Sequence, residues 1–177
     1  MISFRGKLAG VALTLSLFAT IAGAQVRRDP LNPVEADQLR DAAQDPAERL
    51  KLYILFSRTR LTSLEQMRAD PKAVNRAQQT HDRLQDFLDV YDELNDNIDT
   101  FVARKADLRK PLKAVIDADT EFQAKLRALK SSADADKNQA DKYDFLLTSV
   151  LDTIDSSEQE HRQLLEAQEE AAKHKKK

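Results

Sequence analysis

The residues best placed for chemistry are Glu158 and His161, whose Glu-x-x-His spacing puts a carboxylate and an imidazole on one face of a helix. Di-iron helical bundles use this spacing twice, together with one Glu from each of two other helices. The second copy is missing, because Gln78 stands where a Glu would have to precede His81. The two histidines would also lie roughly 20 Å apart along a bundle. With Asp119 added, the set makes at most a weak mononuclear site, so we predict no metal and no cofactor.

The same side chains have a second interpretation as part of a core. His81, Asp119 and His161 all fall on stripes of otherwise apolar residues. A polar layer inside a helical core would fix the register of the helices against one another. The sequence does not decide between this layer and a weak binding site.

Residues for nucleophilic catalysis are scarce. The chain has no Cys, and its three glycines all lie within the first 24 residues, so no Ser stands in a Gly-flanked turn. The lack of Gly also excludes phosphate-binding loops and nucleophile elbows, because both need backbone conformations that Gly adopts most cheaply. Ser156 and Ser157 are near His161 in sequence, but that is not a catalytic triad. We predict no catalytic residue and no enzyme activity.

Residues 1–24 have the pattern of an export signal. Two positive residues precede 8–21, a run of 14 residues without charge, and Ala22-Gly23-Ala24 follows as a small-x-small cleavage site. The alternative is an uncleaved anchor, but a membrane-spanning helix needs roughly 20 apolar residues. We therefore expect cleavage before Gln25 and a periplasmic or secreted protein that does not span a membrane afterwards.

The chain that would remain is mildly acidic. The full sequence has a net charge of −2, and loss of Arg5 and Lys7 with the signal takes it to −4. Nucleic-acid binding needs a basic face, so we expect no nucleic acid as the main partner. An exported protein without Cys must also obtain its stability from packing alone.

Helix signals cover most of residues 25–177. Asn32-Pro33, Asp45-Pro46 and Asp70-Pro71 each pair a capping side chain with a proline at the next position, which is typical of a helix start. Long segments also carry apolar residues at alternating steps of three and four, the repeat of helices packed side by side. The sequence predicts helices at 33–44, 46–69, 71–106, 109–133 and 137–172. Whether Asp70-Pro71 is a reversal or a kink stays open.

These helices predict an all-α fold, an antiparallel up-down bundle of three to four long amphipathic helices with coiled-coil-like packing. Short links should make sequential helices neighbours, with 71–106 and 137–172 longer than the other two. The domains would be 25–45, a segment with a short helix; 46–172, the bundle; and 173–177, a basic tail. The repeats could close a bundle within one chain or between two, so a homo-oligomer stays open.

Two features suggest contact with other molecules. Residues 52–56 are five apolar residues in succession, enough to cover a helix on all sides. This is explained either by a very buried helix or by an interaction surface. The tail is either a frayed end or a contact for anionic envelope components. The candidate interaction residues are Leu52, Tyr53, Leu55, Phe56, Lys173, Lys175, Lys176 and Lys177.

Taken together, the sequence predicts a non-enzymatic helical bundle, secreted or periplasmic, that binds another protein or a component of the cell envelope. The first alternative is an envelope chaperone that holds unfolded clients, because amphipathic, charge-rich helices and an exposed apolar run suit that task. The distant alternative is a ferritin-like metal-binding bundle. The sequence does not identify the partner.

Overall fold

The computed structural model describes residues 29–133 and 140–174, and within these ranges the chain is helical, with no strand. The helices are α1 (Pro33–Asp41), α2 (Pro46–Ala69), α3 (Arg76–Ala103), α4 (Arg109–Ala133) and α6 (Asp144–His174). The predicted all-α fold is confirmed. The predicted signal at 1–24 and the tail residues 175–177 lie outside the described residues. In the described part of the chain, no helix combines the length and the apolar character needed to cross a membrane.

Helices α1 and α2 begin where the sequence predicted. The Asn32 side chain accepts hydrogen bonds from the backbone N–H groups of Val34 and Glu35, and the Glu35 carboxylate accepts one from the Asn32 N–H. Each side chain thus satisfies a backbone donor that the helix itself leaves unpaired. Asp45 caps α2 in the same way, by accepting from the N–H groups of Ala47 and Glu48.

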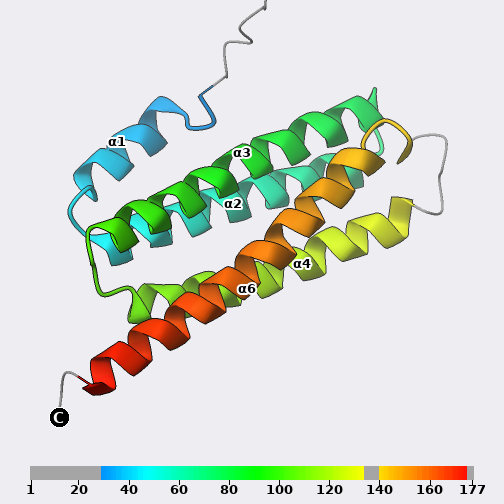
Figure 1. The fold of residues 1–177 in the computed structure, drawn as a ribbon. Helices are drawn as coiled ribbons and strands as arrows, with labels where there is room; N and C mark the ends of the chain where they lie inside the picture. Colours follow the sequence, from blue (N-terminus) through cyan, green and yellow to red (C-terminus); the bar gives the residue numbers. More distant parts are fainter. Residues whose placement is uncertain (1–28, 134–139, 175–177) are drawn as a thin grey trace, which may run out of the picture.

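The predicted helix start at Asp70-Pro71 is wrong. Asp70 ends α2, and its side chain accepts a hydrogen bond from the Lys72 backbone N–H, which bends the chain into a turn. Asn75 then adopts a left-handed conformation with a φ of 49°, and α3 begins after it at Arg76. The junction is a reversal, because α2 and α3 run in opposite directions (Figure 1).

Two other helices also differ from their predicted bounds. Helix α1 ends at Asp41, three residues before the predicted end, and α6 runs from Asp144 to His174, where 137–172 was expected. The bounds of α2 and α4 agree with the prediction. Helices α3 and α6, with 28 and 31 residues, are longer than α2 and α4, with 24 and 25, as expected.

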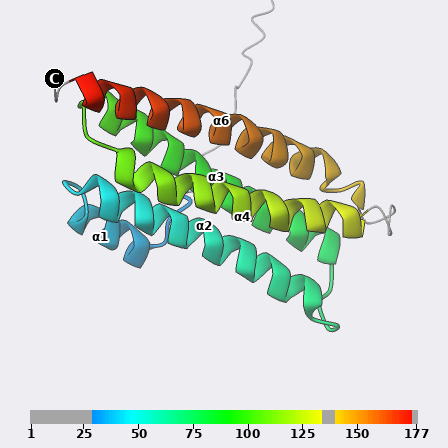
Figure 2. The ribbon, with the colours of Figure 1, turned by 90° about the horizontal axis from the view of Figure 1, so that it is seen from below.

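The four long helices form a square bundle in which consecutive helices are not always neighbours. Helix α2 packs against α3 and α4, and α6 packs against the same two helices. Helices α2 and α4 run in one direction, and α3 and α6 in the other (Figure 1). Seen from below, α4 lies in front of α3 (Figure 2). The prediction that all sequential helices are neighbours is therefore wrong for α3 and α4, which lie on a diagonal.

The diagonal crossing is made by residues 104–108 and held by the last helix. The Gln168 side chain of α6 accepts a hydrogen bond of 2.8 Å from the Leu108 N–H and donates one of 3.2 Å to the Ala106 carbonyl. Leu108 itself is fully buried. Gln168 thus satisfies two backbone groups of the connection where it crosses the end of the bundle.

Aromatic rings fill the middle of the bundle across this diagonal. Phe87 and Tyr91 of α3 meet Phe122 of α4 edge-to-face, with ring centroids 5.4 Å and 6.3 Å apart. Phe87 and Tyr91 also stack on each other at 5.9 Å. All three side chains are fully buried. Rings of this size can bridge the centre of a four-helix square, and they place the Tyr91 hydroxyl in the core.

Candidate functional site

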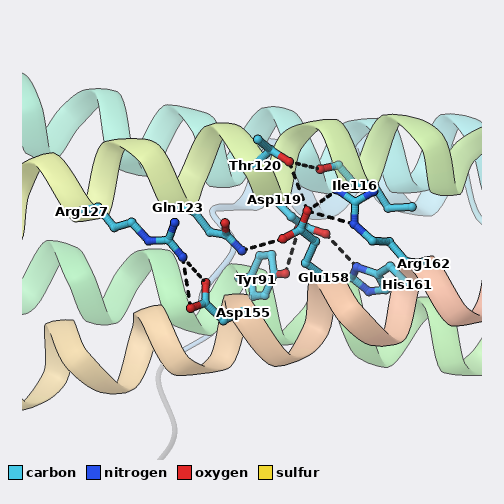
Figure 3. Close-up of polar contacts among 10 residues, drawn as sticks. All are labelled: Tyr91, Ile116, Asp119, Thr120, Gln123, Arg127, Asp155, Glu158, His161 and Arg162. Atoms are coloured by element: carbon cyan, nitrogen blue, oxygen red, sulfur yellow. Dashed lines mark hydrogen bonds and ion pairs between the residues drawn. The ribbon is translucent and has the colours of Figure 1, made fainter.

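A buried polar network lies beside these rings and joins three helices. The Tyr91 hydroxyl of α3 donates a hydrogen bond of 2.8 Å to Asp119 Oδ1 of α4. The Nδ1 atom of His161, on α6, lies 2.8 Å from Asp119 Oδ2. Asp119 is 0% exposed and His161 is 4% exposed. Figure 3 shows both side chains reaching the same carboxylate, so each of its oxygens has a partner.

The network continues from Tyr91 through α6 and back to α3. Ser157 of α6 accepts a hydrogen bond of 3.0 Å from Asn95 Nδ2 and lies near the Tyr91 hydroxyl. Burial, followed by the nearby Asp119 carboxylate, raises the pKa of Tyr91 far above its ordinary value of 10. The phenol therefore stays a neutral donor at any physiological pH. The side-chain oxygen of Asn95 is buried without a hydrogen-bond partner.

Glu158 forms a second polar cluster beside this network, nearer the surface (Figure 3). Its carboxylate accepts hydrogen bonds from Gln123 Nε2 at 2.8 Å, from Thr120 Oγ1 at 3.2 Å and from the Arg162 guanidinium (Figure 3). The bonds from Arg162 are the main cause that lowers the pKa of Glu158, against the opposing effect of burial. Glu158 is thus a carboxylate held by three donors, two of them on α4.

The histidines separate into two environments. His161 is in the buried network, whereas the side chain of His81 is 39% exposed and lies 3.4 Å from Asp82. The predicted layer therefore unites Asp119 and His161 but excludes His81, because α3 turns that residue to the bundle surface. Among residues 29–133 and 140–174 there is no group of three or more His, Asp or Glu side chains suited to hold a metal ion.

The geometry resembles part of a catalytic triad without its decisive contact. Asp119 orients the His161 ring through Nδ1, as the Asp of a Ser-His-Asp triad does. The nearby hydroxyl of Ser157, however, has its hydrogen bond to Asn95 and none to His161. A base can activate a hydroxyl only by bonding to it. What this arrangement does chemically is to tie α3, α4 and α6 together through groups that would be costly to leave unpaired.

Tyr91, Asn95 and Ser157 had no role assigned from the sequence, although Tyr91 and Asn95 lie on the apolar stripe of α3 and Ser157 shares the stripe of α6 with His161. The signal that could have found them is their helical spacing. Tyr91 and Asn95 are one turn apart on α3, and Ser157 and His161 are one turn apart on α6. Because α3 and α6 run in the same direction, two such pairs at the same height along the bundle indicate that their side chains form one polar layer.

The predicted interaction residues fall in several places. In the apolar run on α2, Tyr53 and Phe56 are buried in the core, Leu52 is partly buried against it, and Leu55 is 50% exposed. Tyr53 and Phe56 therefore do not belong to an exposed surface. At the end of α6, Lys173 is exposed and forms an ion pair of 2.6 Å with Glu170.

An open groove of about 510 Å³ runs between α2 and α4; Leu55 is not one of its lining residues, but it follows Ile54, which is. Ile54, Ala114 and Ala118 contribute apolar surface to it. Its charged residues include Arg58 and Glu121, which pair across the two helices at 2.7 Å. The bonds from Arg58 are the main cause that lowers the pKa of Glu121.

Comparison with known proteins gives no relative for this fold. No protein-family model, no curated protein and no solved structure matches this chain.

Proposed function

We propose that this chain is an exported, non-enzymatic helical bundle that binds another protein along the groove between α2 and α4. The observation that carries the proposal is the position of Leu55, a half-exposed leucine in the middle of α2. Lys51 and Arg58 lie one turn before and after it, and both line the groove. A leucine beside an apolar floor with a charged rim is the composition expected of a small protein-binding surface.

The chemistry of the buried network supports a binding role over catalysis. Its polar atoms bond mainly to one another, and its aspartate and histidine are almost inaccessible to a substrate. In a bundle with coiled-coil-like packing, such a layer acts on stability and register. A binding partner would then contact the helix faces that lie outside the buried network.

The export part of the proposal rests on residues 1–24 and has its own test. If the signal is cut as proposed, N-terminal sequencing of the full chain expressed in a bacterium with an outer membrane will begin at Gln25. A protein that keeps its first residues and stays in the cytoplasm would contradict export without touching the binding proposal.

The binding proposal is tested by a photo-activated cross-linking residue at Leu55 of the full chain. A matched variant carries it at Asp152, an exposed position on α6 away from the groove. We expect one adduct of defined mass from Leu55 and none from Asp152, and the L55D variant should lose the partner. Equal labelling from both positions would refute a binding site at this groove. Adducts of many different masses would indicate the client-holding class instead.

A further inference from the structure

Helix α1 is attached to the bundle on one side only. Its main packing partner is α2, whereas each of the four long helices packs against two other long helices. It lies outside the square, against α2 (Figure 1). The bundle core therefore does not need α1 in order to close.

Two arginines of α2 hold α1 in place. Arg60 donates through both terminal nitrogens to the Glu35 carboxylate, at 2.7 Å and 2.6 Å, and also bonds to the Pro30 carbonyl at 3.0 Å. Arg49 donates to the Leu39 carbonyl at the other end of α1. Both contacts come from side chains of α2.

The face beneath α1 is apolar between these arginines. Residues 49, 53, 56 and 60 recur at helical spacing, so Tyr53 and Phe56 lie on the same face of α2 as the arginines. Leu39 of α1 is buried in the same apolar cluster as those two side chains. The apolar run at 52–56 is thus covered in part by a helix that forms no other layer of the bundle.

An open cleft borders α1 on the side toward α3. Its volume is about 590 Å³, and its lining includes Leu31 and Leu39 together with Tyr53 of α2 and Glu93 of α3. Elements with incomplete packing and few apolar contacts are those that open locally at the lowest free-energy cost.

We propose that α1 is a displaceable strap, and that the face it covers on α2 is a binding site for a helix of another protein. The chemistry of that helix is given by the present occupant. It carries a carboxylate in its first turn to pair with Arg60 and a leucine one turn later to replace Leu39. This site lies on a different face of α2 from the α2–α4 groove and does not depend on it.

The test uses a fluorescent peptide with the sequence of residues 29–43, added to the full chain and followed by fluorescence anisotropy. In the chain itself, E35A/L39A loosens the strap and leaves the α2 face intact. The matched control V34A/D37A removes the same kinds of group from the exposed side of α1. We expect E35A/L39A to bind the peptide at least tenfold more tightly than the wild type, and the control to bind as the wild type does.

Charge reversal checks the pairing with Arg60. Addition of R60E to the loosened chain should abolish binding of the peptide, and a peptide with Glu35→Arg should restore it. The proposal is overturned if E35A/L39A, with an unchanged helical circular dichroism spectrum, binds no more peptide than the wild type. It is also overturned if R60E has no effect.

Hydrogen exchange on the unaltered chain gives a readout that needs no variant. Amides of α1 should exchange at least a hundredfold faster than those in the middle of α2, and equal protection would exclude a displaceable strap. If instead the wild type is a dimer that the peptide dissociates, the occupant is the α1 of a second copy, which overturns the assignment to another protein.

Discussion

Lys105 occupies a backbone position that normally belongs to glycine. Its φ is 59°, in the left-handed region, and it follows Arg104, the C-cap residue of α3. Its N–H bonds to the Val102 carbonyl at 2.9 Å, and the Ala106 N–H bonds to the Phe101 carbonyl at 3.0 Å. These two bonds define the Schellman ending of a helix, in which Gly is the preferred residue at this position.

We predict that Lys105→Gly stabilises the protein. A left-handed conformation costs an L-residue about 1 to 2 kcal/mol, because its Cβ approaches the following carbonyl oxygen. Gly avoids this cost, but it also has more conformational freedom in the unfolded chain, which lowers the free energy of unfolding by about 0.4 to 1 kcal/mol. The net gain is about 0 to 1.6 kcal/mol, centred near 0.8 kcal/mol. For a domain of this size, a gain of about 0.8 kcal/mol raises Tm by about 2 to 3 °C.

Urea unfolding followed by circular dichroism at 222 nm measures this difference. Lys105→Ala is the matched control, because it removes the charge and keeps the Cβ, and it should be no more stable than the wild type. Lys105→Asn should fall between Ala and Gly, since Asn tolerates the left-handed region. The reasoning is refuted if Gly is no more stable than Ala, because the backbone conformation would then contribute nothing.

Three further predictions concern buried polar groups. Ser57 is fully buried and its hydroxyl has no partner, so Ser57→Ala should be neutral or stabilising by up to about 1 kcal/mol. Ser157→Ala should instead cost about 1 kcal/mol, because it removes the hydrogen bond with Asn95. Equal effects of the two substitutions in urea unfolding would contradict this. Tyr91→Phe leaves an oxygen of Asp119 without its donor and should cost about 1 to 3 kcal/mol. Because the pKa of Tyr91 is raised in the folded state, wild-type stability should fall above pH 10, where the unfolded chain ionises, and fall less in Tyr91→Phe; parallel pH profiles would contradict the assignment. Burial acts to raise the pKa of Glu35, but the hydrogen bonds to its carboxylate outweigh burial, and the pKa is lowered from its ordinary value of 4.5. The ionised Glu35 therefore stabilises the folded state fully above pH 4.5, and this stabilisation is lost as the pH falls through the lower pKa of the folded state. Glu35→Gln should therefore reduce amide protection in α1 about ten- to a hundredfold near pH 7, in line with about 1.5 to 3 kcal/mol for a charged hydrogen bond, and the difference should vanish in acid.

Local chemistry explains why several helix bounds could be predicted. Asn32 and Asp45 each accept hydrogen bonds from N–H groups only two or three residues away, so a short segment of sequence is enough to predict the cap. Asp70 carries the same dipeptide, yet there its side chain stabilises a turn after α2. An Asp-Pro pair favours both a helix start and a turn after a helix. Which of the two forms depends on where the packing of α2 against the other helices ends.

In the candidate site, too, some features follow from local sequence and others do not. Asp119 and His161 were identified as polar residues on apolar stripes, because helical spacing reveals which face a residue occupies. Spacing does not reveal how two helices are rotated or shifted against each other. His81 lies on an apolar stripe of its own helix and still remains at the surface, whereas Tyr91 reaches Asp119 across the diagonal.

The sequence by itself determined the helical class, the bounds of α2 and α4 and the relative lengths of the helices, since capping, periodicity and the absence of Gly after residue 24 act over a few residues. Only the tertiary structure decided that α3 and α4 face each other across a diagonal, that Asp119 meets both Tyr91 and His161, and that α1 covers Tyr53 and Phe56. These are contacts between residues far apart in the chain. They depend on the simultaneous packing of several helix faces, which no single segment encodes.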